Sequence, residues 1–319
     1  MSASARFAVG LDLGGTNARA AAVDERGRIL SSSKVLLGER SLAGALGSLA
    51  ACVSGTLKAL GRDMGDCAGV GLGFAGQIDA ANGRVLVAPN LGWRDVDVAG
   101  PLASLLGLPV RLGNDLAVAA LGEATSGAAR GFPDAVLVFV GSGVGSGLIL
   151  GGRIHHGARG LAGELGHTKV LPGGRLCGCG ERGCLEAYAG GVNLGKRAAE
   201  LMSEGRESSL VFPAGMHPTM SMIERAAEEG DALCRELRSG AAELVGVAAA
   251  NVVTLLNPGA LLLGGGVLMG SPWMRARVEE VVRANAAQAA LERCMIVDPA
   301  LGDDAGVIGG AMLAFGAGR

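Results

Sequence analysis

The feature that most constrains the fold is a pattern that occurs twice along the chain. In "FAVGLDLGGTNARAAAVD", residues 7–24, an apolar run leads into a glycine-rich tip and returns as a second apolar run. "AVLVFVGSGVGSGLIL", residues 135–150, repeats this order. Apolar runs joined by short glycine-rich turns predict β-hairpins. We therefore predict two related halves, each opening with a glycine-tipped hairpin, and we place the boundary between them near residue 112.

Helical patterns alternate with the predicted strands. Small and apolar residues recur at three- and four-residue steps in residues 41–60, and Gly61 can end that helix. Further helices are predicted at 101–107, 116–130, 190–205, 220–258, 273–287 and 304–315, and further strands at 67–76, 108–115, 260–267 and 294–300. This alternation predicts the α/β class. We expect a small N-terminal α/β domain over 1–112, completed by the C-terminal helix 304–319, and a large α/β domain over 113–303.

Composition and charge argue against several kinds of partner. With 49% hydrophobic residues and a net charge of −2, the chain can bury a sizeable core and carries no basic block. We therefore expect no binding to nucleic acid or to membranes. The N-terminus lacks the pattern of a signal peptide, and no run of about 18 apolar residues follows it. We expect a cytoplasmic protein whose seven cysteines stay reduced.

The first glycine-rich tip could bind the phosphates of a nucleotide. Asp12 ends the preceding strand, and Gly14, Gly15 and Thr16 follow it. Consecutive backbone N–H groups at such a tip can form an anion-binding nest, and Asp12 could hold a metal ion on a polyphosphate. The spacing of a Walker A loop is absent. An ordinary tight hairpin is the alternative.

Two further glycine clusters could approach the same ligand. The second tip offers Gly141, Ser142 and Gly143, and "LLGGGV" offers Gly264, Gly265 and Gly266 after a predicted strand. Two tips in equivalent positions of two halves suggest a cleft that holds phosphates from both sides. The third cluster could let an adenosine lie against the backbone. Each cluster by itself is also compatible with a simple turn.

The pair Asn114–Asp115 lies between a predicted strand and a predicted helix. A carboxylate at such a junction can face a cleft, and a kinase acting on a hydroxyl needs a base within hydrogen-bond reach of it. Either residue could instead only cap the following helix. The pair by itself leaves both interpretations open.

One short segment has the spacing of a metal site. "GHTKVLPGGRLCGCGERGC", residues 166–184, offers His167, Cys177, Cys179 and Cys184. Three thiolates and one imidazole fit tetrahedral Zn²⁺. Four protein ligands leave no open position, so we expect a structural ion rather than a catalytic one. The C-x-x-C spacing of a redox motif is absent, and unpaired thiols are the alternative.

Two glutamates flank this segment. Glu164 precedes His167 by three residues, and Glu186 follows Cys184 by two. A metal loop would fix both carboxylates, which could then hydrogen-bond neighbouring hydroxyls of a sugar. Solvated surface glutamates are the alternative.

Taken together, these motifs resemble the ROK family (repressors, open reading frames and kinases) of the sugar kinase, Hsp70 and actin superfamily. The resemblance covers nearly the whole chain and rests on "GLDLGGTNARAAAVD", "GVGLGFAGQIDAANGRVLVAPNLGW", "GNDLAVAALGEA", "GSGVGSGLILGGRIHHGARGLAGELGH", "CGCGERGCLEAYAGG", "LNPGALLLGGGV" and "LGDDAGVIGGA". It implies two ribonuclease-H-like domains of the actin-like ATPase type, an interdomain cleft and a zinc-binding loop. It also implies ATP, Mg²⁺ bound with ATP, and a homodimer.

The resemblance implies a role for each candidate residue. Asp115 falls on the position of the general base that takes the proton of the sugar hydroxyl. Positions for sugar binding fall on Gly76, Asn90, Asn114, Asp115, Glu164, His167 and Glu186. Positions for phosphate and Mg²⁺ fall on Asp12, Gly14, Gly15, Thr16, Gly141, Ser142 and Gly143, and the adenosine side falls on Gly264, Gly265 and Gly266.

The expected function is ATP-dependent phosphorylation of a hexose at its 6-hydroxyl, with glucose as the first choice. The sugar-side loop reads "AGQID" where many glucokinase-like members have "PGxVD", so Ala75 and Gln77 bear on which sugar is used. The alternatives within the family are N-acetylglucosamine or N-acetylmannosamine kinases and fructo-, manno- or allokinases. A sugar-sensing transcriptional regulator of the same family is disfavoured, because only about six residues precede the first strand and no helix-turn-helix is found there.

Overall fold

The computed structural model describes residues 6–14 and 17–318. The chain divides into two compact units, one of residues 1–136, 147–163 and 299–319 and the other of residues 137–146 and 164–298. Each unit is described by itself below. The predicted division at residue 112 follows the repeat in the sequence rather than compactness, and it stays a prediction.

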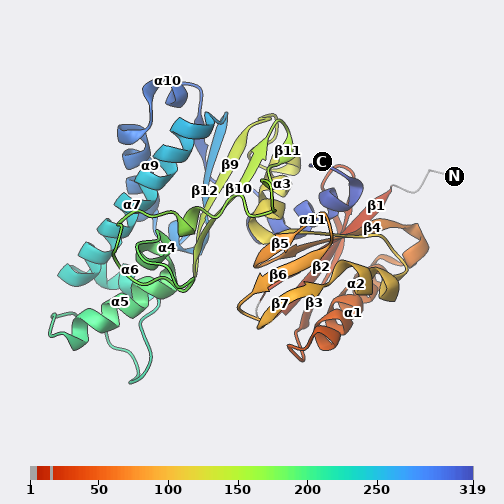
Figure 1. Cartoon of the computed structure of the whole chain (residues 1–319), viewed down its shortest axis with the longest axis horizontal. Coiled ribbons are helices and arrows are strands. Elements are labelled where there is room, and N and C mark those ends of the chain that lie inside the picture. Colours follow the sequence, from red (N-terminus) through yellow and green to blue (C-terminus); the bar gives the residue numbers. More distant parts are fainter. Residues whose placement is uncertain (1–5, 15–16, 319) are drawn as a thin grey trace. The chain divides into compact units, whose positions relative to one another are not determined.

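The first unit is built on a five-stranded sheet with the order β3-β2-β1-β4-β8. Its strands are β1 (Phe7–Leu13), β2 (Asn17–Asp24), β3 (Ile29–Leu36), β4 (Cys67–Phe74) and β8 (Val110–Asn114). β1 pairs with β2 in antiparallel and with β4 in parallel, and β8 extends the parallel part. The predicted first hairpin is therefore present as β1 and β2 (Figure 1), and the three parallel strands end at the same edge of the sheet.

Helix α1 (Leu42–Leu60) covers one face of this sheet. Ser41 caps its start by accepting a hydrogen bond from the N–H of Gly44, and Gly61 ends it in the left-handed conformation at φ 68°. The predicted stop at Gly61 is thus confirmed. Its buried face packs with Val9 and Leu11 of β1 in one apolar cluster.

Helix α11 (Ala305–Phe315) covers the opposite face and lies unusually close to the strands. Gly10 of β1 shows this, since a Cβ there would lie 1.7 Å from the carbonyl oxygen of Val307. A Cβ at Gly71 of β4 would lie 1.9 Å from the carbonyl oxygen of Gly310. These distances are far below van der Waals contact, so only glycine fits at either position. Glycines along β1 and β4 therefore let the helix backbone rest on the strand backbones.

The remaining helices of the first unit are short or join the strand ends. They are α2 (Ala99–Leu106), α3 (Asp115–Ser126), η1 (Met64–Asp66) and η3 (Gly302–Asp304). α3 also packs closely on α11, because a Cβ at Gly309 would lie 1.8 Å from the carbonyl oxygen of Val118.

A small antiparallel sheet of three strands, which the sequence did not predict, extends the first unit. Its strands are β5 (Gln77–Asp79), β6 (Arg84–Ala88) and β7 (Trp93–Asp97). Trp93 stacks on Phe74, with ring centroids 5.6 Å apart, and donates its indole N–H to the carbonyl oxygen of Arg40 at 3.0 Å. This aromatic contact fixes the small sheet next to the end of β4.

A second five-stranded sheet has the order β11-β10-β9-β12-β13. Its strands are β9 (Ala135–Val140), β10 (Val144–Leu150), β11 (Arg153–Ile154), β12 (Ala260–Gly264) and β13 (Met295–Val297). The chain passes between the units within β9, after Val136, and within β10, after Ser146. The second predicted hairpin is therefore present as β9 and β10.

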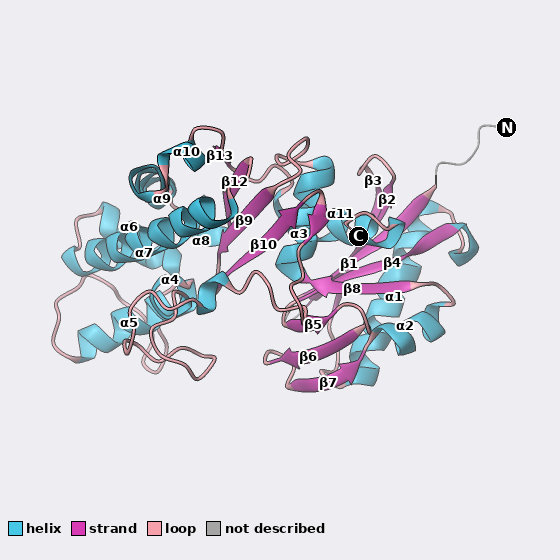
Figure 2. Ribbon diagram, turned by 45° about the horizontal axis from the view of Figure 1, so that its top comes forward, coloured by secondary structure: helices cyan, strands magenta, loops and turns pink. Residues whose placement is uncertain are grey.

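Helices make up most of the second unit (Figure 2). They are α4 (Glu186–Ala189), α5 (Gly191–Ser203), α6 (Met220–Glu228), α7 (Ala232–Leu256), α8 (Gly266–Met269), α9 (Pro272–Asn285), α10 (Gln288–Leu291) and η2 (Leu165–His167). α7 packs along α9, and Gly246 allows the approach, since a Cβ there would lie 2.5 Å from Cβ of Val281. The observed elements confirm the predicted α/β class.

Two helices, α1 and α7, have the length and apolar composition of a membrane-spanning helix. Each also buries one face against its own unit, including Leu49 and Val53 of α1 and Val245 and Val253 of α7, all fully buried. Core helices of soluble proteins share these properties, so length and composition alone are weak evidence here.

Candidate functional site

In the first unit, the candidate residues gather at the carboxyl ends of the parallel strands. Asp12 of β1 is paired with Gly73 of β4, and the last pair of β4 and β8 joins Phe74 to Asn114. Ligands of open α/β sheets bind at this edge. The strand register thus brings Asp12 and the Asn114–Asp115 pair to the same edge of the sheet.

The Asn114 side chain makes two kinds of structural contact. Its Oδ1 accepts hydrogen bonds from the N–H groups of Leu116 and Ala117, at 3.0 and 3.1 Å, and so caps α3. Its Nδ2 donates to the carbonyl oxygen of Gly76 at 3.2 Å, which joins the start of α3 to the loop after β4. Asn114 therefore caps α3, and the same side chain also contacts the predicted sugar-side loop.

Asp115 follows as the first residue of α3, half-buried, with Oδ1 accepting from the N–H of Leu116 at 3.0 Å. Burial raises the pKa of Asp12 to about 6, and the nearby charge of Asp115 adds to this, against the opposite influence of Arg19. A buried carboxyl group whose pKa is raised by a neighbouring carboxylate marks a place that favours a bound cation.

The other candidates of the first unit are less closely tied to this pair. Gly14 is exposed, and its N–H donates to the carbonyl oxygen of Asn17 at 3.0 Å, which closes the first tip. Gly15 and Thr16 lie outside the described residues. Gly76 has φ 152°, and a Cβ there would lie 2.4 Å from the carbonyl oxygen of Val87. Asn90 lies in the turn between β6 and β7 with its side chain exposed.

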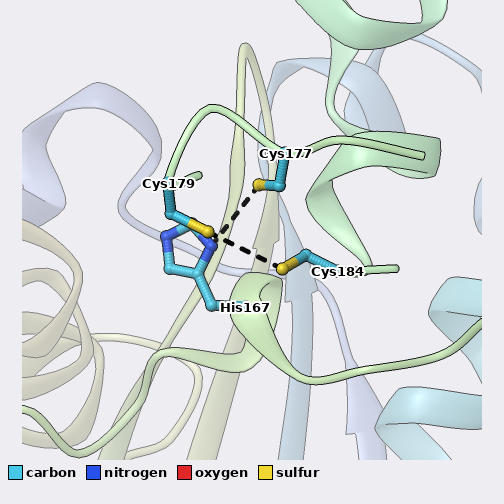
Figure 3. A group of neighbouring side chains, drawn as sticks. All are labelled: His167, Cys177, Cys179 and Cys184. Carbon is cyan, nitrogen blue, oxygen red and sulfur yellow. Dashed lines mark hydrogen bonds between the residues drawn. The ribbon is translucent and has the colours of Figure 1, made fainter. Parts of the chain in front are cut away.

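In the second unit, the predicted metal ligands come together. Ligand atoms of His167, Cys177, Cys179 and Cys184 all lie within 4.8 Å of one another. Figure 3 shows the four side chains directed toward a common centre. Cys177 and Cys184 are buried, and Cys179 is exposed. Tight turns at Gly180 and Gly183, with φ 90° and 80°, let the loop bring the sulfurs together.

The distances fit a tetrahedral zinc ion. Zn–S and Zn–N bonds of about 2.3 and 2.05 Å place ligand atoms about 3.6–3.8 Å apart around a tetrahedron. The Sγ atoms of Cys179 and Cys184 are 3.7 Å apart, and Nδ1 of His167 is 3.7 Å from Sγ of Cys177. A disulfide would need about 2.05 Å between sulfurs, and all seven cysteines are free. The donor set and its spacing therefore fit Zn²⁺.

The electrostatics of the loop also favour a cation. Burial raises the pKa of Cys177 to about 12, and the neighbouring thiols add to this. Three thiols this close cannot all ionise without a positive charge among them. Lys169 supplies one such charge, with Nζ 3.1 Å from Sγ of Cys184. The loop thus has the charge pattern of a metal centre supported by an outer cation.

The two flanking glutamates lie against this loop. Nε2 of His167 is 3.8 Å from a carboxylate oxygen of Glu164, so one ring nitrogen faces the thiols and the other faces Glu164. Burial raises the pKa of Glu164, His167 opposes this, and the charge of Glu186 adds to it. Both glutamates therefore lie near the cluster rather than at separate places on the surface.

Glu186 also joins the loop to the second glycine-rich tip. Its carboxylate accepts from the N–H of Val144 at 3.0 Å. A Cβ at Gly143 would lie 2.4 Å from that carboxylate, so the contact needs glycine. The predicted sugar-side and phosphate-side residues of this unit are thus in direct contact.

The second tip borders a hollow of about 270 Å³ in the second unit. Gly141 and Ser142 line it together with Gly266, and Gly265 turns the chain there at φ 97°. Gly264 is buried at the end of β12. His217 and its neighbours form another wall, which the sequence motifs did not indicate.

An α/β fold with carboxylates at the parallel strand ends, and with the second glycine tip beside a hollow, agrees with the expected actin-like ATPase type. The sequence model of the ROK family matches residues 8–317, and the chain belongs to this family.

Three relatives match over nearly their full length. A glucokinase from Halalkalibacterium halodurans is 34% identical over 97% of this chain and 95% of its own. The ROK hexokinase of Thermus thermophilus has a TM-score of 0.84 and 33% identity over 97% of this chain and 98% of its own. A ROK family glucokinase from Streptomyces griseus, solved in complex with glucose and AMPPNP, has a TM-score of 0.80 and 33% identity. The match to this last structure covers 98% of this chain and 100% of the other.

Proposed function

We propose that this chain is an ATP-dependent sugar kinase that phosphorylates glucose at its 6-hydroxyl. The observation that carries the proposal is the full-length similarity, at 33% identity, to a ROK family glucokinase solved with glucose and AMPPNP. The glucokinase from Halalkalibacterium halodurans supports the same sugar. We further propose that the protein is cytoplasmic and acts as a homodimer.

In the proposed reaction, the sugar O6 attacks the γ-phosphorus of ATP. The O6–P bond forms, the bond from the γ-phosphorus to the bridging oxygen breaks, and ADP leaves with that electron pair. Asp115 takes the proton of the 6-hydroxyl. Its place at the first turn of α3, half-buried and fixed beside the Asn114 cap, supports this role.

Sugar binding is assigned to two groups of residues. In the first unit, Asn114 and the backbone at Gly76 are joined by a hydrogen bond, and Asn90 belongs to the same sugar-side segment. In the second unit, Glu164, His167 and Glu186 present polar groups around the cysteine loop. Carboxylates held in this way can accept hydrogen bonds from vicinal hydroxyls.

Phosphate binding is assigned to the glycine-rich tips. The first group is the sequence motif of Gly14, Gly15 and Thr16, and the second is the tip of Gly141, Ser142 and Gly143. Asp12 would hold Mg²⁺, which neutralises charge on the β- and γ-phosphates when it is bound. Gly264, Gly265 and Gly266 are assigned to the adenosine side.

Zn²⁺ in the His167, Cys177, Cys179 and Cys184 site would have a structural role. Four protein ligands leave no place for a substrate atom. The ion would hold His167 between the thiols and Glu164, and it would fix the loop that carries Glu186.

A coupled assay for ADP release, run over a panel of hexoses and N-acetylhexosamines, tests the proposed function. We expect the highest kcat/KM with glucose and a product phosphorylated at O6. A higher kcat/KM for N-acetylglucosamine, N-acetylmannosamine, fructose, mannose or allose would correct the sugar. If none of these sugars caused ADP release, the kinase assignment would be overturned.

A further inference from the structure

The hollow beside the second tip has four walls from four separate segments of the second unit. Three of them begin with glycine: the tip at Gly141, the start of α5 at Gly191 and the start of α8 at Gly266. The fourth wall is residues 217–220, which join the loop after α5 to α6. The motifs of the family resemblance do not include this fourth segment, so they assign no role to it.

The three glycine walls pack backbone against backbone. The N–H of Gly191 donates to the carbonyl oxygen of Gly141 at 2.9 Å, and the N–H of Val192 donates to that of Ser142 at 3.2 Å. A Cβ at Gly265 would lie 2.4 Å from the carbonyl oxygen of Val140. A ligand at these three walls would meet mainly backbone atoms and the side chains of Val192 and Val267. Such a surface suits a flat, largely apolar group.

The fourth wall is firmly held on both sides. A Cβ at Gly195 of α5 would lie 2.1 Å from the carbonyl oxygen of Pro218 and 2.8 Å from Nδ1 of His217. Thr219 caps α6 by accepting from the N–H of Met222. Within α6, Glu224 forms a buried ion pair with Arg238 of α7 at 2.7 Å. Residues 217–220 are therefore a built wall rather than a loose loop.

Three side chains with hydrogen-bonding groups occur among the described residues that line the hollow: Ser142, His217 and Thr219. The Thr219 hydroxyl is engaged in the α6 cap and with Ser221 at 2.9 Å. Ser142 belongs to the tip assigned to phosphate. His217 Nδ1 lies 3.4 Å from the carbonyl oxygen of Pro218, which can only accept, and in the tautomer that donates from Nδ1 to this oxygen, Nε2 is an acceptor.

We propose that residues 217–220 form the nucleoside wall of the phosphoryl-donor site, and that His217 selects a nucleotide donor by accepting a hydrogen bond from its nucleoside part. Val192, Val267 and Met220 enclose the base through apolar contact, and the neighbouring Ser142 leads to the phosphates. This inference rests on the proposed function and assigns the specificity of its donor to a segment outside the family motifs.

Calorimetric titration with two probes tests the proposal. ADP carries a nucleoside, and inorganic tripolyphosphate does not. We expect His217→Ala to weaken ADP binding about tenfold, the loss of one hydrogen bond to a ligand, while tripolyphosphate binding changes less than twofold. His217→Gln, which keeps an acceptor, should recover part of the loss. Equal weakening of both probes would indicate a general disturbance and would overturn the role of His217.

A matched pair of glycine variants tests the wall itself. Gly195→Ala should displace the Pro218 carbonyl and weaken ADP binding severalfold. Gly240→Ala is the control, because Gly240 lies in α7 and a Cβ there meets nothing within 4 Å. Unchanged ADP binding in both His217→Ala and Gly195→Ala, or no ADP binding by the unmodified protein, would overturn the inference. Sugar phosphorylation measured in parallel separates this result from a failure of the proposed function.

Discussion

The molecule holds two pairs of acidic side chains by different means. In the first unit, Asp12 and Asp115 are fixed by strand register and by the first turn of α3. In the second unit, Glu164 and Glu186 are fixed by contacts with a loop whose thiols and imidazole converge on one point. Ordinary secondary structure is enough for the first pair, whereas the second pair depends on a loop with little regular structure. The two pairs should therefore respond differently to substitution, to loss of an ion and to pH.

The largest expected effect concerns the first pair. Asp115→Asn should lower kcat by about 10³-fold, because the amide cannot take the proton of the sugar hydroxyl. Glucose affinity, measured by calorimetry, should change less than threefold. Asp63→Asn is the matched control, since the Asp63 side chain forms no capping hydrogen bond at η1. A kcat within threefold of the unmodified protein would remove Asp115 from the role of base.

The next effect concerns the second pair. Cys179→Ser should release zinc and weaken glucose binding tens of fold, because the loop would no longer fix the two glutamates. Zinc content by elemental analysis and glucose affinity by calorimetry check this. Cys294→Ala, which removes a thiol far along the chain from the loop, should keep one zinc ion per chain. Loss of zinc with unchanged glucose affinity would show that the second pair does not depend on the ion.

A third prediction uses the pH dependence of the first pair. The pKa of Asp12 is raised from 3.8 to about 6, chiefly by burial, so its charged form destabilises the folded state in the absence of Mg²⁺. Asp12→Asn should therefore raise the free energy of unfolding at pH 7 by roughly 1–3 kcal/mol. The increase in the free energy of unfolding should grow as the pH rises from 4 to 6 and stay constant above pH 6. Below pH 4 it should vanish. Denaturant unfolding at several pH values measures it, and a gain that persists at pH 3.5 would contradict the cause given.

The smallest expected effect sharpens the account of the second pair. Lys169 places its Nζ 3.1 Å from Sγ of Cys184 and stabilises the thiolate charge. Lys169→Met should lower zinc affinity about tenfold, the usual cost of losing a group that supports a metal ligand. Competition with a coloured chelator measures this, with Lys34→Met on β3 as the control. Equal zinc affinity in both variants would leave Lys169 without a role at the loop.

Sequence patterns predicted the elements that carry strong local signals. The two hairpins, the end of α1 at Gly61 and the convergence of His167 with the three cysteines all follow from apolar runs, glycine and ligand spacing. The α/β fold and the family also follow from the motifs and are confirmed.

Other features depend on contacts between distant segments and were missed. The strands β5, β6 and β7 have three to five residues each, too few for a clear alternation, and they are stabilised by Trp93 stacking on Phe74. The wall at residues 217–220 exists because Gly195, in a different helix, leaves room for the Pro218 carbonyl. The local sequence of either segment does not indicate the distant residue, Phe74 or Gly195, on which its structure depends.

The close approach of α11 to β1 and β4 has a consequence for the synthesis of the chain. Residues 7–13 leave the ribosome long before residues 305–315, which form the helix that covers one side of their sheet. Until then Gly10 and Gly71 present bare backbone, with no side chains of their own to shield that side. That side of the N-terminal sheet must therefore wait for the synthesis of α11 before it closes, and a nascent chain stalled before residue 305 should be a strong client of chaperones.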